Sequence, residues 1–121
     1  MSKFLLEVKN LKKSFEHSNG SITLFDNFNI KIKEGELVAL VGPSGSGKST
    51  LIDVLLCLIE PNNGYLKIDG EIINHQNRRS WQNVIGFVAQ TIFLSEGTIA
   101  ENIAFGISHD QIDLDQVKKV I

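Results

Sequence analysis

The chain has 121 residues, 42% of them hydrophobic, and a formal net charge of -2 from 12 basic and 14 acidic residues. These values fit one ordinary globular domain or part of one, and they give no support for a nucleic-acid-binding surface or a polybasic membrane anchor. The single cysteine, Cys57, excludes an internal disulfide and fits a reducing compartment. The apolar runs are too short to span a bilayer, and no signal-peptide core follows the start.

The first third of the chain predicts an antiparallel β section. Residues 5–9 alternate weakly, residues 11–15 continue the pattern, and the polar residues 16–21 contain an Asn-Gly turn signal. Residues 22–25 predict a short strand, and residues 28–32 alternate apolar with polar side chains, as a half-buried strand does. We therefore expect a β-rich section before the motif that follows.

A glycine-rich motif at residues 42–49 carries the clearest chemical signal in the sequence. It fits the phosphate-loop pattern G-x-x-x-x-G-K-[ST]. The apolar run at residues 37–41 predicts a strand buried on both faces, and residues 50–59, which lack Gly and Pro, predict a helix. Because both flanks agree with the motif, a chance glycine-rich turn is disfavoured. The motif and the next residue are Gly42, Pro43, Ser44, Gly45, Ser46, Gly47, Lys48, Ser49 and Thr50.

Each residue type in this motif has a physical task. Gly42, Gly45 and Gly47 lack a Cβ, so the backbone can approach a phosphate closely. The N–H groups of the loop and the helix start would face the anion, aided by the helix dipole. We expect Lys48 to reach the β- and γ-phosphates of a nucleotide and the Ser49 hydroxyl to ligate Mg²⁺.

The middle of the chain predicts a helix and then a second hairpin. The helix is expected to end at Glu60, because the sequence Pro-Asn-Asn-Gly at residues 61–64 is a strong stop. Residues 65–74 predict a hairpin around an Asp-Gly turn, residues 76–80 a polar loop, and residues 84–89 a second, largely apolar strand. The apolar face expected on the helix comprises Leu51, Val54, Leu55 and Leu58.

Two capping patterns predict short helices near the end of the chain. Thr98, with Glu101 three residues later, fits a capping box, and Asp113 with Gln116 fits a weaker one. An apolar helical face follows the second pattern at Leu114, Val117 and Ile121.

Taken in order, these motifs resemble the ATP-binding domain of ABC transporters, and the resemblance covers essentially the whole chain. Residues 42–49 match the Walker A loop, Phe15 falls where the family has an aromatic residue stacking on adenine, and Gln90 matches the Q-loop glutamine. Residues 93–106 resemble the segment after that glutamine in exporter-type domains. The resemblance implies an α/β fold, a P-loop NTPase core with an antiparallel β subdomain at the N-terminus.

The resemblance also implies a function. The chain would be the ATP-binding part of an ATPase that powers substrate export across a membrane, with ATP and Mg²⁺ as cofactors. Phe15, the motif and Thr50 would bind the nucleotide. Ser49 and Gln90 would hold the metal, and Gln90 would also help to hold the attacking water and sense the membrane subunit. The implied partners are a transmembrane subunit or domain and a second ATP-binding domain, at the cytoplasmic face of the membrane, without nucleic acid and without insertion into the bilayer.

The departures from the family pattern matter equally. The signature loop, the Walker B strand with its catalytic Glu, and the switch histidine have no counterpart in residues 1–121. Residues 94–98 resemble a signature loop, but they lie where the exporter pattern already explains them. We therefore expect residues 1–121 to be the N-terminal part of such a domain, truncated after the Q-loop region. Two alternatives stay open: a nucleotide-binding remnant without hydrolytic activity, and another P-loop NTPase or kinase, against which the β-rich start argues.

The remaining candidate residues favour structural interpretations. Cys57 is expected to be a small core residue, and Trp81 to pack at the edge of the sheet instead of stacking on a base. Three histidines lie in polar turns without a second ligand at metal spacing, and we expect them at the surface; they are His17, His75 and His109.

Overall fold

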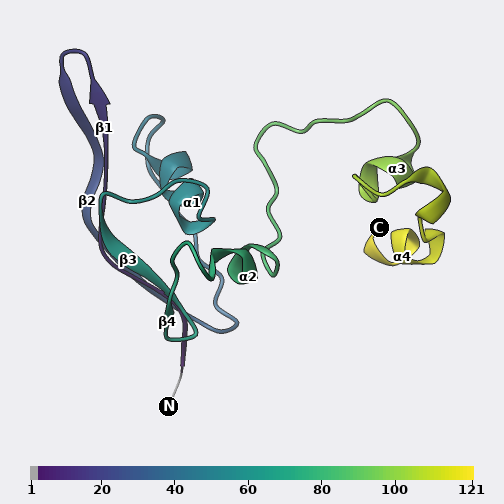
Figure 1. Ribbon diagram of the computed structural model, residues 1–121, viewed down its shortest axis with the longest axis horizontal. Coiled ribbons are helices and arrows are strands. Elements are labelled where there is room, and N and C mark those ends of the chain that lie inside the picture. Colours follow the sequence, from purple (N-terminus) through teal and green to yellow (C-terminus); the bar gives the residue numbers. More distant parts are fainter. Residues whose placement is uncertain (1–2) are drawn as a thin grey trace. The chain divides into compact units, whose positions relative to one another are not determined.

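The computed structural model describes residues 3–121, which divide into two compact units after Gly86 (Figure 1). The first unit contains strands β1 (Phe4–His17), β2 (Gly20–Lys33), β3 (Asn63–Ile68) and β4 (Glu71–Ile72) and helices α1 (Lys48–Leu55) and α2 (Arg78–Gln82). The second unit contains helices α3 (Ile99–Ile103) and α4 (Leu114–Val120) and the 3-10 helix η1 (His109–Gln111). In the described part of the chain, no helix is long and apolar enough to cross a membrane.

An antiparallel sheet of order β2-β1-β3-β4 organises the first unit (Figure 1). β1 and β2 meet at the predicted Asn-Gly turn, where His17 pairs with Gly20. The two strands predicted at residues 22–25 and 28–32 are joined into the single strand β2. The predicted antiparallel β section is therefore confirmed, as is the second hairpin, which turns at residues 69–70 between β3 and β4.

A bulge in β1 explains how this strand faces the core. Leu6 and Val8 alternate normally, and Leu11 would then point away from them. Asn10 takes a φ of 52°, its N–H is held by Oδ1 of Asn29 at 2.9 Å, and the pairing with β2 shifts between Val8 and Leu11. The extra residue returns Leu11 to the core side, where its side chain is fully buried.

Helix α1 covers this side of the sheet with part of its predicted apolar face. Leu51 and Val54 are buried against Leu6, Val8, Leu11 and Leu66, whereas Leu58 lies beyond the helix and is exposed. The prediction that the helix ends at Glu60 is wrong. It ends at Leu55, because Cys57 adopts a left-handed conformation (φ 57°) and the N–H groups of Cys57 and Leu58 donate to Val54 and Asp53, the bonds of a Schellman motif.

Two predicted strands do not form. Residues 37–41 and residues 84–89 carry no ladder hydrogen bonds, and most of their large apolar side chains are exposed, Leu37 completely. A buried parallel strand needs hydrogen-bonded neighbours on both sides, and the described residues provide none for either segment. The apolar sequence is therefore not sufficient to form a strand here.

The predicted polar loop at residues 76–80 is also partly wrong, because α2 begins at Arg78. Trp81 and Gln82 fix this helix to the end of α1. The Trp81 indole N–H donates to the Leu55 carbonyl at 2.8 Å, and the Gln82 amide donates to the Leu56 carbonyl at 3.0 Å. Trp81 thus packs at the C-terminal end of α1, where it satisfies a carbonyl that the helix leaves unpaired.

The second unit confirms both predicted helices. α3 begins with a complete capping box, in which the Thr98 hydroxyl accepts from the Glu101 N–H while the Glu101 carboxylate accepts from the Thr98 N–H. Asp113 caps the start of α4, and its carboxylate accepts from the N–H groups of residues 115 and 116. Val117 of α4 is buried, and it lines a groove with apolar residues of the segment 103–107.

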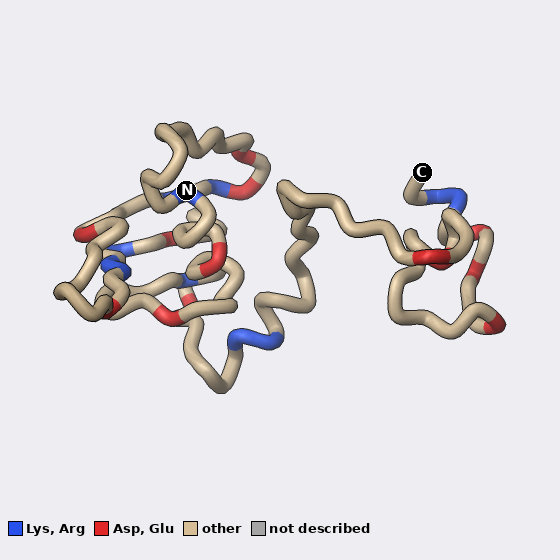
Figure 2. Tube along the Cα trace, turned by 90° about the horizontal axis from the view of Figure 1, so that it is seen from above, with Lys and Arg blue, Asp and Glu red and all other residues tan. Residues whose placement is uncertain are grey.

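Basic and acidic positions alternate along the chain trace of both units (Figure 2). This distribution agrees with the balanced composition.

Candidate functional site

The candidate site is the segment of residues 42–49, which we call the glycine loop. It follows residues 37–41, which form no regular secondary structure, and its last two residues begin α1. Gly45 and Gly47 have positive φ values of 80° and 90°, which residues with a Cβ adopt only with strain. At Gly47 a Cβ would also lie 3.3 Å from Leu24, a tight contact, so both the backbone conformation and the neighbouring strand favour glycine here.

Lys48 turns its ammonium group back into the glycine loop. Nζ donates to the carbonyl oxygens of Gly42 and Pro43, the latter at 2.8 Å, and lies 3.4 Å from Oγ of Ser46. The cation is thus held within the curve of the loop by neutral acceptors, with no carboxylate among these three partners. None of these three partners neutralises its positive charge.

The start of α1 adds further donors beside this cation. Gly47 caps the helix without a side-chain hydrogen bond, and no acidic residue lies in the first turn. The first intrahelical bond runs from the Leu51 N–H to the Gly47 carbonyl at 2.9 Å, so the N–H groups before residue 51 have no partner within the helix. Uncapped N–H groups and the positive end of the helix dipole favour an anion at this position.

The β1–β2 hairpin places Phe15 on the side of the sheet that contacts the glycine loop. Phe15 pairs with Ile22, and Lys13 pairs with Phe25, so these four side chains share one face of the hairpin. Leu24 of β2 has no partner in β1 and forms a bulge. A Cβ at Gly47 would lie 3.6 Å from the Phe25 ring, so the loop packs against this same face. Phe15 itself is 44% exposed and therefore accessible to a ligand.

The other predicted site residues differ in how far the structure positions them. Ser49 and Thr50 lie in the first turn of α1, with Ser49 exposed and Thr50 half-buried. Pro43, Ser44 and Ser46 are exposed in the loop. Gln90 is exposed in the second unit, so its predicted contact with metal and water stays a prediction.

Sequence reasoning missed the residues that support the site. Leu24 and Phe25 hold the back of the glycine loop, and Lys13 lies over the Phe15 ring. Strict alternation along β2 would predict which face of the sheet Phe25 occupies. The unpaired residue Leu24 shifts this alternation by one residue, and no sequence pattern reveals the bulge.

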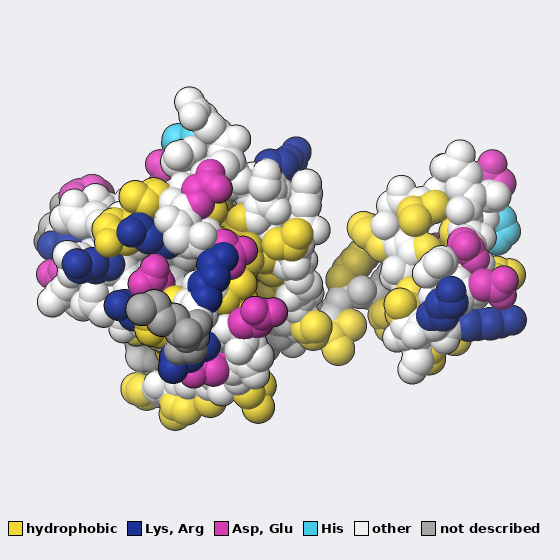
Figure 3. All heavy atoms as spheres, turned by 90° about the horizontal axis from the view of Figure 1, so that it is seen from below, with side chains coloured by type: hydrophobic (Ala, Val, Ile, Leu, Met, Phe, Trp, Pro, Cys, Tyr) yellow, Lys and Arg dark blue, Asp and Glu magenta, His cyan; other side chains and the backbone are white. Residues whose placement is uncertain are grey.

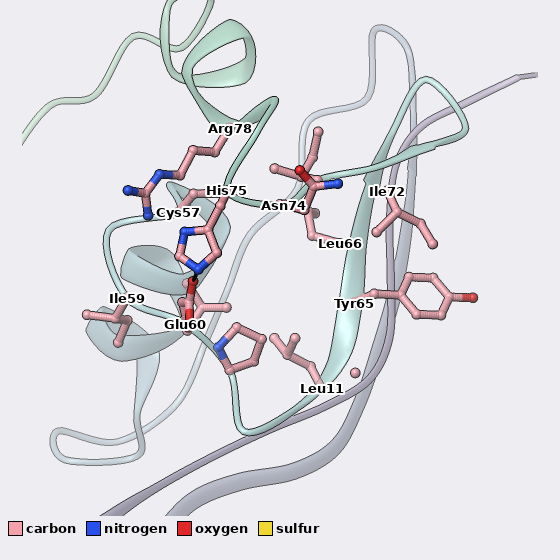
Figure 4. A pocket seen from close by; sticks show the side chains of 14 residues that line it. Leu11, Cys57, Ile59, Glu60, Tyr65, Leu66, Ile72, Asn74, His75 and Arg78 are labelled. Carbon is pink, nitrogen blue, oxygen red and sulfur yellow. Dashed lines mark ion pairs between the residues drawn. The ribbon is translucent and has the colours of Figure 1, made fainter.

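A cavity of about 220 Å³ in the first unit lies apart from the glycine loop and includes none of its residues (Figure 4). Its walls are mainly apolar, and at one side Glu60 and His75 point toward each other with 2.5 Å between Oε1 and Nε2. Burial raises the pKa of the Cys57 thiol in this wall, an effect that the positive charge of Arg78 partly opposes. A raised pKa disfavours the reactive thiolate, in agreement with a structural role for Cys57.

No group of three or more His, Cys, Asp or Glu side chains among residues 3–121 is arranged to hold a metal ion.

Comparison with known proteins gives consistent matches. Residues 25–121 match a protein-family model described as "ABC transporter". The chain is 45% identical over 96 residues to ABC transporter B family member 22 of Arabidopsis thaliana, covering 79% of this chain and 8% of that protein. It is 36% identical over 108 residues to the ATP-dependent lipid A-core flippase of Cupriavidus pinatubonensis, covering 88% of this chain and 18% of the flippase. The chain thus spans less than a fifth of the length of either relative.

Solved structures show the same likeness. A bacterial Atm1-family ABC exporter with ATP bound matches 94% of this chain at 30% identity and a TM-score of 0.79, over 19% of its own chain. The dimeric ATP-binding cassette MJ0796, in a post-hydrolysis state bound to ADP and Pi, matches 88% of this chain at 30% identity and a TM-score of 0.73, over 51% of its own. These likenesses confirm the predicted fold class, part of a P-loop NTPase cassette with an N-terminal antiparallel β subdomain.

Proposed function

The chain belongs to the ABC transporter family as part of an exporter-type ATP-binding domain, and on this premise we propose that its glycine loop binds the phosphates of ATP. In the intact transporter this binding would contribute to ATP hydrolysis that powers substrate export. The exporter and the cassette named above were solved with ATP and with ADP and Pi respectively, which supports a nucleotide ligand.

The arrangement of Lys48 at the uncapped start of α1 is the observation that carries this proposal. Its ammonium is held by the loop carbonyls of Gly42 and Pro43 and by no carboxylate in the loop, and it lies beside helix N–H groups without intrahelical partners. The cation and these donors belong to the same loop and helix start, which suits a multiply charged phosphate chain better than a neutral ligand.

The remaining predicted site residues have complementary proposed roles. The exposed Phe15 ring would stack on the adenine base, and the backbone from Gly42 to Thr50 would surround the phosphates. The Ser49 hydroxyl and the Gln90 amide oxygen would hold Mg²⁺, which when bound neutralises charge on the β- and γ-phosphate oxygens. Gln90 would also orient the attacking water.

The proposed partners follow from the relatives. One match is a dimeric cassette and another is an exporter, so we propose that this domain pairs with a second ATP-binding domain and with a transmembrane subunit or domain. It would then lie at the cytoplasmic face of the membrane.

The alanine variant Lys48→Ala tests nucleotide binding directly. Hydrogen bonds to charged groups contribute about 1.5–3 kcal/mol each, so we expect ATP affinity to fall about tenfold or more in isothermal titration calorimetry. Lys31→Ala is the matched control, because it removes the same charge from β2, where Lys31 pairs with Glu7. Equal ATP affinity for the wild-type chain and Lys48→Ala would overturn the proposal.

Turnover separates the ATPase interpretation from a remnant that only binds nucleotide. Phosphoryl transfer needs charge stabilisation and a positioned water beyond what the glycine loop and Gln90 provide. We therefore expect residues 1–121 alone to release phosphate from ATP very slowly or not at all. Mg²⁺-dependent phosphate release that Lys48→Ala abolishes would contradict this expectation and would show that the chain is a complete catalyst.

A further inference from the structure

Lys13 makes two contacts that join the base side of the site to the segment after α1. Its ammonium nitrogen lies 4.9 Å from the centroid of the Phe15 ring, within the range of a cation–π interaction. The same nitrogen donates to the Glu60 carbonyl at 2.7 Å. One face of the Phe15 ring is therefore covered by a cation that is itself fixed at a second point.

The segment that accepts this hydrogen bond is firmly attached to β1. The Asn62 N–H donates to the Lys12 carbonyl at 2.8 Å, and the Ser14 N–H donates to Oδ1 of Asn62 at 2.7 Å. These bonds hold the backbone on both sides of Lys13 against the residues that follow Glu60. A half-buried lysine held in this way loses little additional freedom when a ligand binds next to it.

The placement of Lys13 relates it to the glycine loop as well. Lys13 pairs across the hairpin with Phe25, and the Phe25 ring packs at Gly47 of the loop. On this face Lys13 therefore lies opposite Phe25, which supports the glycine loop, and the Phe15 ring follows two residues further along β1.

We propose that Lys13 is a positioning residue for the nucleotide base: it fixes the Phe15 ring from behind and leaves the opposite ring face to a purine. A cation on one face draws π-electron density toward itself, so the other face becomes a better partner for an electron-rich purine ring. Lys13 touches the base only through Phe15, and a ring face does not distinguish the exocyclic groups of adenine and guanine. This inference rests on the proposed nucleotide binding.

The test compares ligands with and without a base. We expect Lys13→Met, which keeps the length of the side chain and removes its charge, to weaken ATP and GTP alike by about two- to fivefold in calorimetry, the range expected for one exposed cation–π interaction. Affinity for inorganic triphosphate, which has no base, is expected to stay unchanged. Lys12→Met is the matched control, because Lys12 pairs with Asp26 at 3.5 Å and is expected to leave all three affinities unchanged.

Two further variants separate positioning from a general effect on the fold. Lys13→Arg keeps a cation that can lie over the ring and donate to the Glu60 carbonyl, so it is expected to restore ATP affinity to within a factor of two of wild type. In a Phe15→Leu background, Lys13→Met is expected to cause no further loss, because the ring through which it acts is gone.

The outcomes also separate this inference from the proposed function. If the wild-type chain binds neither ATP nor triphosphate, the proposed function itself fails. If it binds both and Lys13→Met weakens triphosphate as much as ATP, Lys13 acts on the phosphates or on the fold, and the inference is overturned while the function stands. Unchanged ATP affinity in Lys13→Met, or an equal additional loss in the Phe15→Leu background, overturns it as well.

Discussion

The β1–β2 hairpin and residues 37–41 follow each other in the sequence and both contain many apolar residues, yet only the hairpin forms a sheet. Along β1, Leu6, Val8 and Leu11 are buried, whereas the side chains of Leu37 and Val41 are almost completely exposed. The difference lies in where each strand finds its partner. β1 pairs with a strand that begins three residues after its end, whereas a buried parallel strand needs neighbours that lie far away in the sequence.

Local pairing therefore decides which apolar segments are structured here. Many of the large hydrophobic side chains left exposed belong to residues 37–41 and to residues 84–94, and hydrophobic side chains are visible on the surface of both units (Figure 3). Exposed apolar segments of this kind are typical sites of association, because unpaired backbone groups lie beside apolar side chains.

The largest expected effect on stability comes from shortening a buried side chain of the β1–β2 hairpin. Leu11 is fully buried, and Leu11→Ala is expected to lower the free energy of unfolding by about 2–5 kcal/mol through lost burial and a cavity. Leu37→Ala, the matched control with a completely exposed side chain, is expected to change it by less than about 0.5 kcal/mol. Urea denaturation of both variants provides the measurement, and similar losses would mean that residues 37–41 are buried in solution.

The bulge in β1 predicts the next largest effect. Gly64 has a φ of 86°, and a Cβ there would lie 2.5 Å from the carbonyl oxygens of Lys9 and Asn10 in the bulge. Gly64→Ala is expected to cost about 2–4 kcal/mol, from the left-handed backbone and the forced displacement of the strand. Gly35→Ala isolates the backbone contribution, because Gly35 has a φ of 79° and open space around it, and about 1 kcal/mol is expected. Equal losses in the two variants would show that β1 moves aside without cost.

The comparison also explains which parts of the fold could be predicted from the sequence. Alternation and turn chemistry are local, so the hairpins, the capping box at Thr98 and the glycine loop were all predictable. The strands predicted at residues 37–41 and 84–89 depend on distant neighbours, and the apolar runs alone contain no information about whether these are present.

The candidate site divides in the same way. Lys48 and the glycines could be identified because the motif is contiguous, whereas Lys13 could not, because its role depends on the register between β1 and β2. The end of α1 was mispredicted because Cys57 adopts a left-handed conformation that is more typical of glycine or asparagine.

A smaller effect on stability is expected in the second unit, where local hydrogen bonds of the capping box stabilise α3. Thr98→Ala removes the oxygen that accepts from the Glu101 N–H, and it is expected to destabilise α3 by about 1 kcal/mol, with Thr98→Ser as the control that keeps the cap. Amide hydrogen exchange within residues 99–103 measures this change. Unchanged exchange in Thr98→Ala would show that α3 does not depend on its cap.

The same cap predicts a pH dependence. The Thr98 backbone N–H, then the Thr98 hydroxyl and the His109 ring, hold the pKa of Glu101 below its ordinary value of 4.5. A lowered pKa in the folded state means that the ionised carboxylate stabilises the cap above pH 4.5 and that this contribution is lost as the pH falls through the folded value. We therefore expect hydrogen exchange in α3 to accelerate at acidic pH beyond its intrinsic change, and to do so less in Glu101→Gln.

The smallest effect on stability is expected from placing a charge in residues 37–41. The same substitution also tests directly whether this segment causes self-association. Leu37→Lys changes a side chain that is completely exposed, so the free energy of unfolding should stay within about 0.5 kcal/mol of wild type. We expect the wild-type chain to self-associate through such exposed apolar segments, and a lysine within residues 37–41 opposes their pairing with another chain. Association measured by sedimentation velocity should therefore decrease in Leu37→Lys. Leu114→Lys, which adds the same charge to an exposed position of α4, is the control for a general effect of net charge and should leave association unchanged. A wild-type chain that sediments as a monomer and melts sharply would show that residues 37–41 need no partner, and equal effects of the two lysines would assign the association to another surface.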